Sequence, residues 1–505
     1  MTINSYGTGA YRAARTTDFV SQRAQFDDLQ RQLATKERST SYGGLGADRT
    51  VSLDLNAKVT TLDSWLDGIQ LSNTNLKLMS NAVSNFATMT SESRNDMRSN
   101  TYLASSTGQT APQVLAQEKF KQTLDLLNTN VNGRYLFSGK TSDVEPVAGF
   151  DEIMNGDGAG KAGLKQLIAE RRQADLGSGL GRLTAGGAGT TATISEEATV
   201  HPYGFKLASA ATNSAGITTA LNAGPPADLS INVTAQPAAG ETVTIGLNLP
   251  DGTTTTIKLT ARATGSQGSD TNSFEIGADT NATAANLRTA ISAALGTEAK
   301  TTLSAASSQV AARDFFAGSP SNPPKRVPGP PFDTATAPPT NAGAAATTVI
   351  WYRGDDGSDP ARGTSTVQVD QGQIVGTGAR ANEQAFQVGL AQFAIMAAET
   401  FPANDPNSQA RYGAMADRVS DKLGFGGATQ KPAEIITELG SAQTALNSAK
   451  DRHQSTKDYL TTTLSGVQNV TTEEVATQIL ALQTQLQASY QVTSMLSKLT
   501  LTNYL

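Results

Sequence analysis

The sequence contains no cysteine, and this absence excludes several kinds of chemistry at once. A disulfide framework, a thiolate metal site and a cysteine nucleophile are all ruled out. The two histidines, His201 and His453, lie far apart in the chain, so a catalytic zinc site is not expected. His453 falls on a predicted helix seam, where a structural role is favoured. We therefore expect no catalytic residue of these types, no metal site and no cofactor.

Charge is also scarce, at 17% of residues against about 25% in typical soluble proteins. The net charge of -6 and the lack of any Lys/Arg run argue against a nucleic-acid partner. No run of about 18 apolar residues occurs, so no membrane span is expected. The first twenty residues lack the apolar core of a cleaved secretory signal. A chain of 505 residues predicts about three domains.

Glycine-rich runs do not reveal an active site. The runs GGLGADRT, GSGLGRL and GFGGATQK lack the spacing of a phosphate-binding loop. The runs NGDGAG and GDDGSD lack the distant bidentate glutamate of a calcium loop, and Asp-Gly pairs favour turns. An enzyme is therefore not expected.

Apolar residues at helical spacing give the clearest structural signal near the amino terminus. The first fifteen residues are predicted to be unstructured, with Thr17 or Asp18 capping the first helix. A second helix carries a strict seven-residue repeat, which predicts a narrow seam that pairs with another long helix. The predicted seam residues in these two helices are Phe19, Phe26, Leu29, Leu33, Leu55, Leu62, Ile69, Leu76 and Val83.

A third helix is predicted to begin at Pro112 and to end at Asn132-Gly133, a pair typical of a left-handed helix cap. The aromatic segment at this point, where the chain would leave the helices, is called the knuckle below. It consists of Asn132, Gly133, Arg134, Tyr135, Leu136, Phe137 and Gly139.

Between the helical ends, Gly, Thr, Ala and Pro dominate and alternating segments predict strands. Pro250-Asp251-Gly252 is predicted to be the turn of a hairpin, and a short helix over 282–295 is capped near Thr280. Residues 319–343 are rich in proline and are interpreted as a semi-extended linker. Two further segments, TTVIWYRGDDG and TSTVQVDQGQIVGTG, are interpreted as hairpin strands.

Helical periodicity returns near Asn382, and Pro432 is predicted to open a long helix. Thr471 and Glu474 form a capping box at the start of the last helix. Its predicted seam residues are Val475, Ile479, Leu482, Leu486 and Leu496. Because both ends share a seven-residue period, we expect them to pair. The predicted fold class is α+β: a long antiparallel coiled-coil-like helical bundle formed by both termini, with a β-rich central insertion.

Five segments follow from these patterns. Residues 1–45 form an N-terminal assembly helix, and 46–147 the N-terminal half of a helical core domain. Residues 148–350 form a β-rich, Gly/Thr/Pro-rich outer insertion. Residues 351–465 form a return hairpin and the C-terminal half of the core domain, and 466–505 a C-terminal assembly helix.

The knuckle, in the run NVNGRYLFSGKTSDVEPV, resembles the segment of the bacterial flagellin and hook-associated-protein family that leaves the third helix for the outer domain. The run LQTQLQASYQVTSMLSKLTLTNYL is similar to the C-terminal helix of that family, and the run WYRGDD with VQVDQGQIVGTGARANEQAF is similar to its return segment. The resemblance covers roughly residues 15–150 and 350–505. The run ATKERSTSYGGLGADRT departs from filament flagellins and favours a junction protein.

The resemblance implies a secreted, extracellular subunit of the flagellum whose helical ends line the wall of a tube. Implied partners are further copies of the chain, the hook-side junction protein, flagellin and an export chaperone. A hook-to-filament junction protein is the favoured function, with filament-forming flagellin as the alternative. A remoter alternative, from a different class, is an extracellular adhesin whose β-rich insert binds a ligand.

Overall fold

The computed structural model describes the chain except for residues 1–5, 100–101, 104–107, 267–271 and 499–505. Contacts divide the chain into two units. The terminal unit comprises 1–71, 368–374 and 444–505, and the central unit comprises 72–367 and 375–443.

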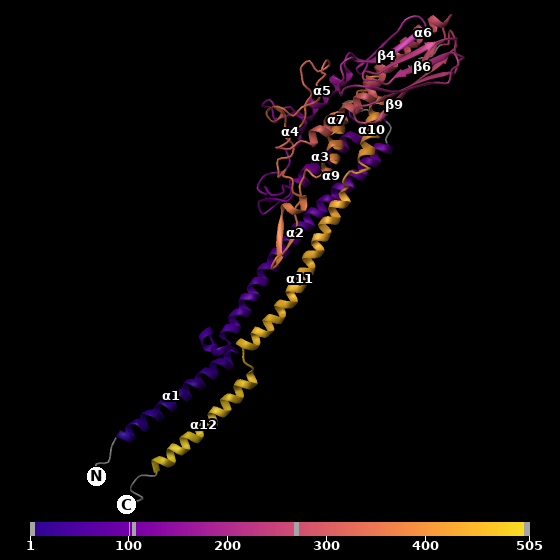
Figure 1. The fold of residues 1–505 in the computed structure, drawn as a ribbon. Coiled ribbons are helices and arrows are strands. Elements are labelled where there is room, and N and C mark those ends of the chain that lie inside the picture. Colours follow the sequence, from indigo (N-terminus) through magenta and orange to yellow (C-terminus); the bar gives the residue numbers. More distant parts are fainter. Residues whose placement is uncertain (1–5, 100–101, 104–107, 267–271, 499–505) are drawn as a thin grey trace, which may run out of the picture. The chain divides into compact units, whose positions relative to one another are not determined.

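The terminal unit is built from helices at both ends of the chain (Figure 1). These are α1 (Tyr6–Thr35), the short helix η1 (Tyr42–Asp48), the first part of α2 (Arg49–Ser99), the last part of α11 (Pro432–Gln468) and α12 (Thr472–Lys498). Helix α1 contacts α12, and the two run in opposite directions because Phe19 lies against Tyr490 while Lys36 meets Val470.

The prediction for the start of α1 is wrong. The helix begins at Tyr6 and runs through Thr17 and Asp18 without a break. Thr17 donates its hydroxyl to the carbonyl oxygen of Ala13, at 2.9 Å. Such bonding back by four residues satisfies a threonine within a helix, so this residue marks no boundary. One of the two bonds of the capping box predicted for the last helix is present, since the Glu474 N–H donates to Thr471 Oγ1 at 3.2 Å.

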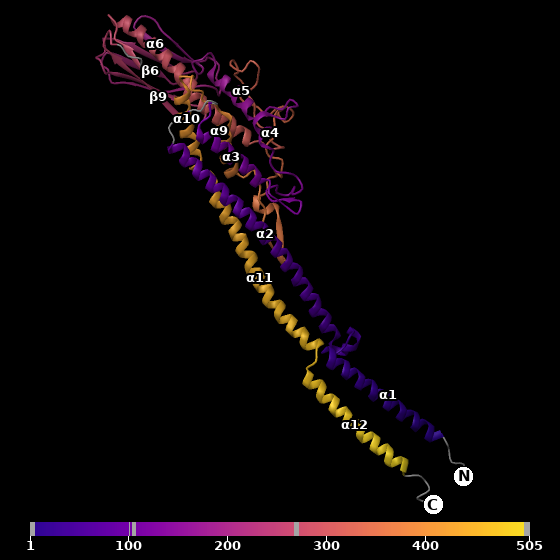
Figure 2. The same ribbon diagram turned by 180° about the vertical axis from the view of Figure 1, so that it is seen from behind.

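Helix α9 (Gln384–Ala398) lies at the middle of the helical part of the central unit (Figure 2). It contacts α3 (Ala111–Leu127), α5 (Leu164–Leu176), α7 (Ser304–Phe316) and α10 (Ser408–Lys422). Its sequence QAFQVGLAQFAIMAA is apolar on almost every side, which is typical of a helix buried on all faces. The predicted face of Phe386, Leu390, Phe393 and Ala397 is buried. Two short helices, α4 (Phe150–Asn155) and α8 (Ala344–Thr347), lie in connecting segments.

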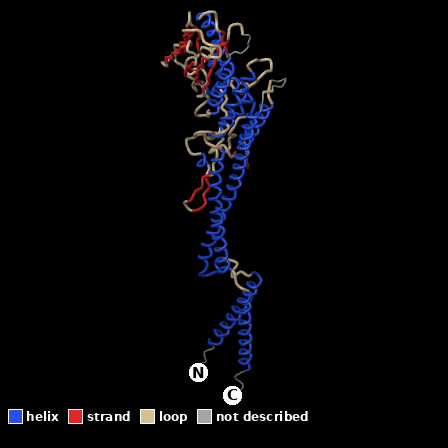
Figure 3. The backbone as a smooth tube through the Cα atoms, turned by 90° about the vertical axis from the view of Figure 1, so that its right-hand side faces the viewer, coloured by secondary structure: helices blue, strands red, loops and turns tan. Residues whose placement is uncertain are grey.

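Most strands of the central unit gather in one region, where most of the red in Figure 3 lies, and we call this region the β module (residues 183–298). One sheet has the order β3-β4-β7-β6, and its strands all pair antiparallel. The other has the order β10-β9-β8-β5, with one parallel pair, β9 and β10. The strands are β3 (Leu183–Gly186), β4 (Thr191–Glu196), β5 (Lys206–Thr212), β6 (Ile217–Asn222), β7 (Asp228–Val233), β8 (Thr242–Asn248), β9 (Thr254–Arg262) and β10 (Ser273–Glu275).

Helix α6 (Thr280–Glu298) closes the core of the β module. Alternate residues of β7 are buried, as expected for a strand with one face on a core. They share that core with Leu287, Ile291 and Leu295 of α6. The predicted helix is therefore confirmed, although Asp279 caps it by accepting from the Ala282 N–H at 2.8 Å. The predicted turn at Asp251-Gly252 joins β8 to β9 as expected.

The knuckle differs from the prediction. Helix α3 ends at Leu127, and Asn132-Gly133 forms the turn of a small hairpin between β1 (Asn130–Val131) and β2 (Arg134–Tyr135). Asn132 and Gly133 have φ of 52° and 80°. Positive φ at both central residues belongs to the type I′ turn, for which Asn-Gly is the preferred sequence. The predicted left-handed backbone conformation of this pair is confirmed, but the pair forms the turn of a hairpin and does not cap a helix.

The hairpin predicted over TSTVQVDQGQIVGTG is present as β11 (Thr366–Asp370) and β12 (Gln373–Gly376). The other predicted hairpin segment is not a strand. Tyr352 forms only an isolated bridge to Val147, and both Trp351 and Tyr352 are fully buried. Sequence interpretation also missed α4, α5 and α7, which lie within the segment expected to be β-rich.

Candidate assembly surfaces

The described residues hold no cluster of three or more His, Asp or Glu side chains placed to bind a metal ion. Within the same residues, no helix combines the length and the apolar character needed to cross a membrane. The two Asp-Gly runs form turns: Asp157 Oδ1 accepts from the N–H groups of Ala159 and Lys161, and Asp355 Oδ1 accepts from Gly357 N–H. These carboxylates serve backbone turns.

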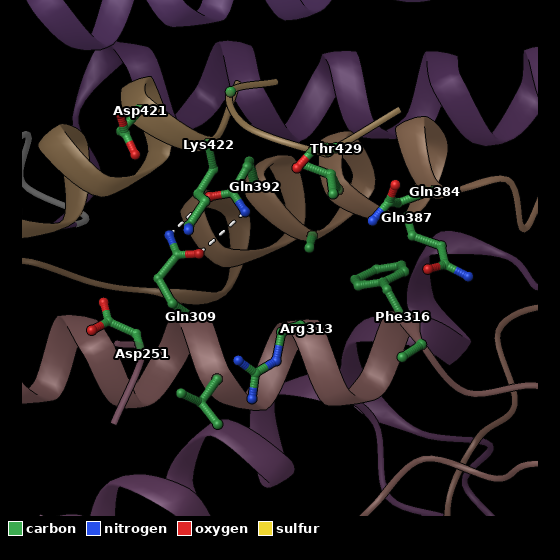
Figure 4. Close-up of a pocket in the computed structure, with 15 residues that line it drawn as sticks. Asp251, Gln309, Arg313, Phe316, Gln384, Gln387, Gln392, Asp421, Lys422 and Thr429 are labelled. Atoms are coloured by element: carbon green, nitrogen blue, oxygen red, sulfur yellow. Dashed lines mark hydrogen bonds between the residues drawn. The ribbon is translucent and has the colours of Figure 1, made fainter. Parts of the chain in front are cut away.

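A cleft of about 340 Å³ lies within the central unit (Figure 4). Gln309 of α7 and Gln392 of α9 exchange two hydrogen bonds across it, at 2.8 and 3.1 Å. Two of the ionic groups on its rim have partners: Arg313 with Asp314, and Asp251 with Arg418 of α10 at 2.8 Å. The Gln309–Gln392 pair thus joins α7 to α9 across the cleft, and the residues that line it place no nucleophile beside a base.

The predicted seam residues of α2 divide between the two units. Leu55, Leu62 and Ile69 are buried in the terminal unit, and Leu76 and Val83 are buried in the central unit. The predicted seven-residue spacing therefore marks a buried face of α2 from Leu55 to Val83. Such a face is expected when a narrow apolar stripe packs against a neighbouring helix.

The first helix and the last helix bury their seam residues less completely. Phe19, Phe26 and Leu29 are half-buried, while Leu33 is 38% exposed. In α12, Val475 and Leu482 are buried, and Ile479 and Leu486 are half-buried. Leu496 lies outside the residues whose side chains are described. The coiled-coil packing of these helices stays a prediction.

Backbone hydrogen bonds tie the two ends of the terminal unit together. The Arg38 N–H donates to Gln468 O at 2.7 Å, and the Val470 N–H donates to Lys36 O at 3.0 Å. These bonds join the segment after α1 to the break between α11 and α12. Gln468 also donates its side-chain amide to Ser52 Oγ of α2, at 2.7 Å. The break between the two C-terminal helices is therefore held by the N-terminal segment.

His453 is a structural residue of the terminal unit, as its position on the seam predicted. Its ring lies 5.2 Å from the ring of Trp65, centroid to centroid, and it is buried. Its Nε2 donates to the carbonyl oxygen of Val369, so that the tip of the β11–β12 hairpin is fixed to α11. Sequence reasoning did not connect His453 with this hairpin, because their contact depends on the tertiary fold.

The terminal unit exposes most of the large apolar side chains that lie on the described surface. In α1 and α12, Val20 is 64% exposed, Leu480 63%, Tyr490 62% and Met495 61%. Exposed apolar residues that are scattered singly are ordinary, but several on two helices that contact each other favour an interaction surface, and these four are called the exposed apolar row below. The others in this unit are Leu33, Tyr42, Val51, Leu53, Leu71, Ile374, Tyr459 and Val492.

The knuckle is anchored in the central unit by one aromatic ring. Phe137 is fully buried, and its ring lies edge-on to Phe386 of α9, with 5.8 Å between centroids. Its carbonyl oxygen accepts from the Ala381 N–H at 2.8 Å. Tyr135 and Leu136 are only half-buried, so Phe137 alone of the three aromatic and aliphatic residues fills the core.

Gly139 is the second fixed point of the knuckle. Its φ is 65°, and a Cβ placed there would lie 2.8 Å from the Cβ of Asp355. Both the backbone conformation and the available space therefore require glycine. Asn132, Gly133 and Arg134 are exposed on the hairpin and make no such anchor.

Residues 425–505 match the family model for the bacterial flagellin C-terminal helical region. The matched segment includes all of α11 and α12. No curated protein matches the chain. The match supports the flagellin family and a flagellar structural subunit. It covers the part of the chain that pairs with α1 and carries much of the exposed apolar surface.

Proposed function

We propose that the chain is a structural subunit of the bacterial flagellum, and specifically a hook-associated junction protein that links hook to filament. The observation that carries this proposal is the exposed apolar row on α1 and α12, which are paired by contacts between both ends of the chain. The flagellin-type C-terminal segment lies in the same unit. Other copies and related axial proteins would cover this surface outside the cell.

Coupled folding and assembly is the mechanism that these surfaces favour. Isolated helices gain little stability from propensity alone, and most of their stability comes from packing an apolar face. In α1 and α12 that face is only partly covered within one chain. Neighbouring copies would bury the remainder, and the helices would become firmly ordered as the subunits join.

Deletion of the last fifteen residues tests the role of the C-terminal helix. We expect a soluble, folded monomer that neither polymerises nor completes the hook, because part of the assembly helix is missing. Sedimentation velocity and electron microscopy of flagella from a strain carrying the truncated chain would measure this. Normal filaments from that strain would contradict the proposed mechanism.

Point variants test the exposed apolar row without shortening the chain. The double change Val20→Ser and Leu480→Ser should raise the critical concentration for assembly by more than about tenfold, since each buried aliphatic side chain contributes about 1.5–3 kcal/mol. The unfolding midpoint of the monomer should change little, because both side chains are mostly exposed there.

The matched control is Val200→Ser, since Val200 is 68% exposed but lies in the β module. Light scattering during assembly would compare the three proteins. If the control lowers assembly as much as the double variant does, or if the double variant assembles normally, the apolar row is not the assembly surface.

A filament-forming flagellin is the alternative within the same structural class. Purified protein seeded with hook fragments separates the two functions. A junction protein should add a short, self-limiting layer, whereas a flagellin should grow long filaments. We expect short oligomers, measured by negative-stain electron microscopy.

An adhesin is tested by removing the β module together with the residues 182 and 299–302 that flank it. A Cβ placed on Gly181 would lie 2.9 Å from Leu303 Cδ2, so the chain enters and leaves the module at neighbouring points. A short Gly-Ser linker replacing 182–302 would retain α5 and α7. We expect the shortened protein to assemble at an unchanged critical concentration, and loss of assembly would contradict this assignment of roles.

A further inference from the structure

The proline-rich segment 319–343, called the strap below, is fastened at several points within the central unit. Arg326 and Thr340 exchange backbone hydrogen bonds of 2.8 and 2.9 Å, which close the strap into a loop. The Arg326 guanidinium pairs with Glu170 of α5. At its far side, Tyr203 donates its hydroxyl to Ala337 O at 2.8 Å. The segment interpreted as a linker is thus a packed cover.

A small apolar cluster lies beneath the strap. Tyr203 and Ala174 contribute the side of the folded body, and Val327 and Ala335 contribute the strap, with Phe332 packed against them. Arg182 crosses this boundary and donates to the carbonyl oxygens of Asp333 and Ala335, the latter at 2.9 Å. Tyr203 and Arg182 are therefore the fasteners that hold this part of the strap.

Tyr203 contacts a histidine, His201, and Arg182 is joined to the same histidine through the carboxylate of Glu197. The side chain of His201 has no exposed surface, and its ring stacks on Tyr203 with 6.0 Å between centroids. Nδ1 accepts a hydrogen bond from the Tyr203 N–H at 3.2 Å, so in this arrangement the ring proton lies on Nε2. Nε2 lies 3.2 Å from Glu197 Oε2, and that carboxylate also pairs with Arg182 at 2.9 Å.

The charged groups around this histidine come from every neighbouring element. Arg182 precedes β3, Lys206 begins β5, and Glu196 and Glu197 end and follow β4. Helix α5 adds an ion pair on the other side of Tyr203, between Arg171 and Asp175 at 2.7 Å. Cations and carboxylates are equal in number, so a protonated imidazole would add an unmatched positive charge.

We propose that the strap is an acid-labile cover, which loosens when buried His201 takes up a proton and uncovers the apolar cluster around Tyr203. A proton on Nδ1 would point at the Tyr203 N–H, which replaces a hydrogen bond with two opposed donors. The extra charge would also stand beside Arg182 and Lys206. Because Tyr203 and Arg182 hold the strap, the strain is transmitted directly to its fasteners.

The direction of the pH effect follows from the burial of the ring. Desolvation, with Lys206 and Arg182 adding to it and Glu197 opposing it, lowers the pKa of His201 below its ordinary value of 6.5. The opened state therefore binds the proton more readily than the closed state does. The stability of the closed strap is complete above about pH 6.5, and it declines as the pH falls from there toward the lowered pKa.

A single cysteine can report on the strap, because the chain has none of its own. Ala335→Cys places a thiol at a buried position, and Thr334→Cys, in a separate variant, places one at an exposed neighbour. Both thiols are labelled with 4,4′-dithiodipyridine, which reacts with thiols in acid. At each pH, the labelling rate of the buried thiol is divided by the labelling rate of the exposed thiol. Between pH 7.5 and 5.0 this ratio should rise. The expected rise is about tenfold for each unit by which the pKa of His201 in the open state exceeds its pKa in the closed state.

The variant His201→Asn separates this histidine from other titrations. An asparagine side-chain oxygen can still accept from the Tyr203 N–H, but it takes up no proton in this range. In this background the ratio should stay constant with pH. The matched control, His453→Asn, removes the other histidine and should leave the pH dependence intact. An acid-dependent rise that persists in His201→Asn, or a constant ratio in the chain with His201, overturns the proposal.

Hydrogen exchange of the unsubstituted full-length chain gives an independent measurement. After correction for intrinsic exchange rates, amides of residues 326–340 should lose protection at pH 5.0 while amides of α9 keep theirs. Equal protection of 326–340 at both pH values would also overturn the proposal. The inference does not depend on the flagellar assignment, since every measurement uses the monomer.

Discussion

Replacing Gly389 with alanine should lower the free energy of unfolding of the central unit by about 2–3 kcal/mol, the cost of overpacking a rigid core. A Cβ at this position would lie 2.4 Å from Cζ of Phe86 and 3.3 Å from Cγ2 of Thr90. Phe86 cannot withdraw easily, because its ring lies 5.0 Å from the ring of Phe386 and 6.5 Å from that of Phe393.

The two tryptophans allow this effect to be assigned to the central unit. Trp65 lies in the terminal unit and Trp351 in the central unit, so a Trp65→Phe background leaves Trp351 as the single reporter. Urea unfolding followed by its fluorescence gives the free energy directly. Phe86→Leu should recover part of the loss in the Gly389→Ala chain, although it destabilises the parent. Additive losses in the double variant would show that the two residues do not interact.

The helical ends were predictable because their signal is repeated many times. In α11, Leu439, Ala442, Leu446, Ala449 and His453 were placed on one face by spacing alone, and all five are buried. If the apolar positions of such a helix were assigned one residue out of register, the apolar stripe would turn away from its partner. The seven-residue period therefore determines which face of the helix is buried. The same reasoning identified the buried positions of α2 from Leu55 to Val83.

Helix α7 was missed for the opposite reason. Its sequence SAASSQVAARDFF is buried on nearly every side, but alanine and serine supply most of its contacts. Hydrophobic periodicity does not detect a face made of small residues, since alanine and serine are also common on surfaces. Because α5 and α9 pack closely against α7, small side chains are favoured on α7. This close packing is a property of the tertiary fold, so the local sequence does not indicate it.

The candidate surfaces were predictable only in part. The sequence predicted seam positions in α1 and α12, but it did not show that Val20, Leu480 and Met495 stay exposed in the single chain. Exposure depends on which faces the partner helix leaves uncovered. Likewise, Tyr203 and Arg182, which neighbour His201, hold strap residues that are distant in the sequence, and no local pattern indicates these contacts.

Replacing Asp175 of α5 with alanine should cost the central unit about 3–5 kcal/mol, because it leaves a buried charge without its partner. Asp175 has no exposed surface, and Arg171, its partner at 2.7 Å, is nearly as buried. Asp175 also accepts from the Gly204 N–H at 2.9 Å. Its removal would leave a buried guanidinium without its carboxylate and a backbone donor without an acceptor.

The double change Arg171→Met and Asp175→Leu provides the control for that variant. Removing both charges together should restore most of the stability, because the cost arises mainly from leaving one charge unpaired. Urea unfolding followed by Trp351 fluorescence in the Trp65→Phe background would measure all variants on one scale. If the double variant is as unstable as Asp175→Ala, then the hydrogen bond to Gly204, and not the ion pair, holds α5 against the β module.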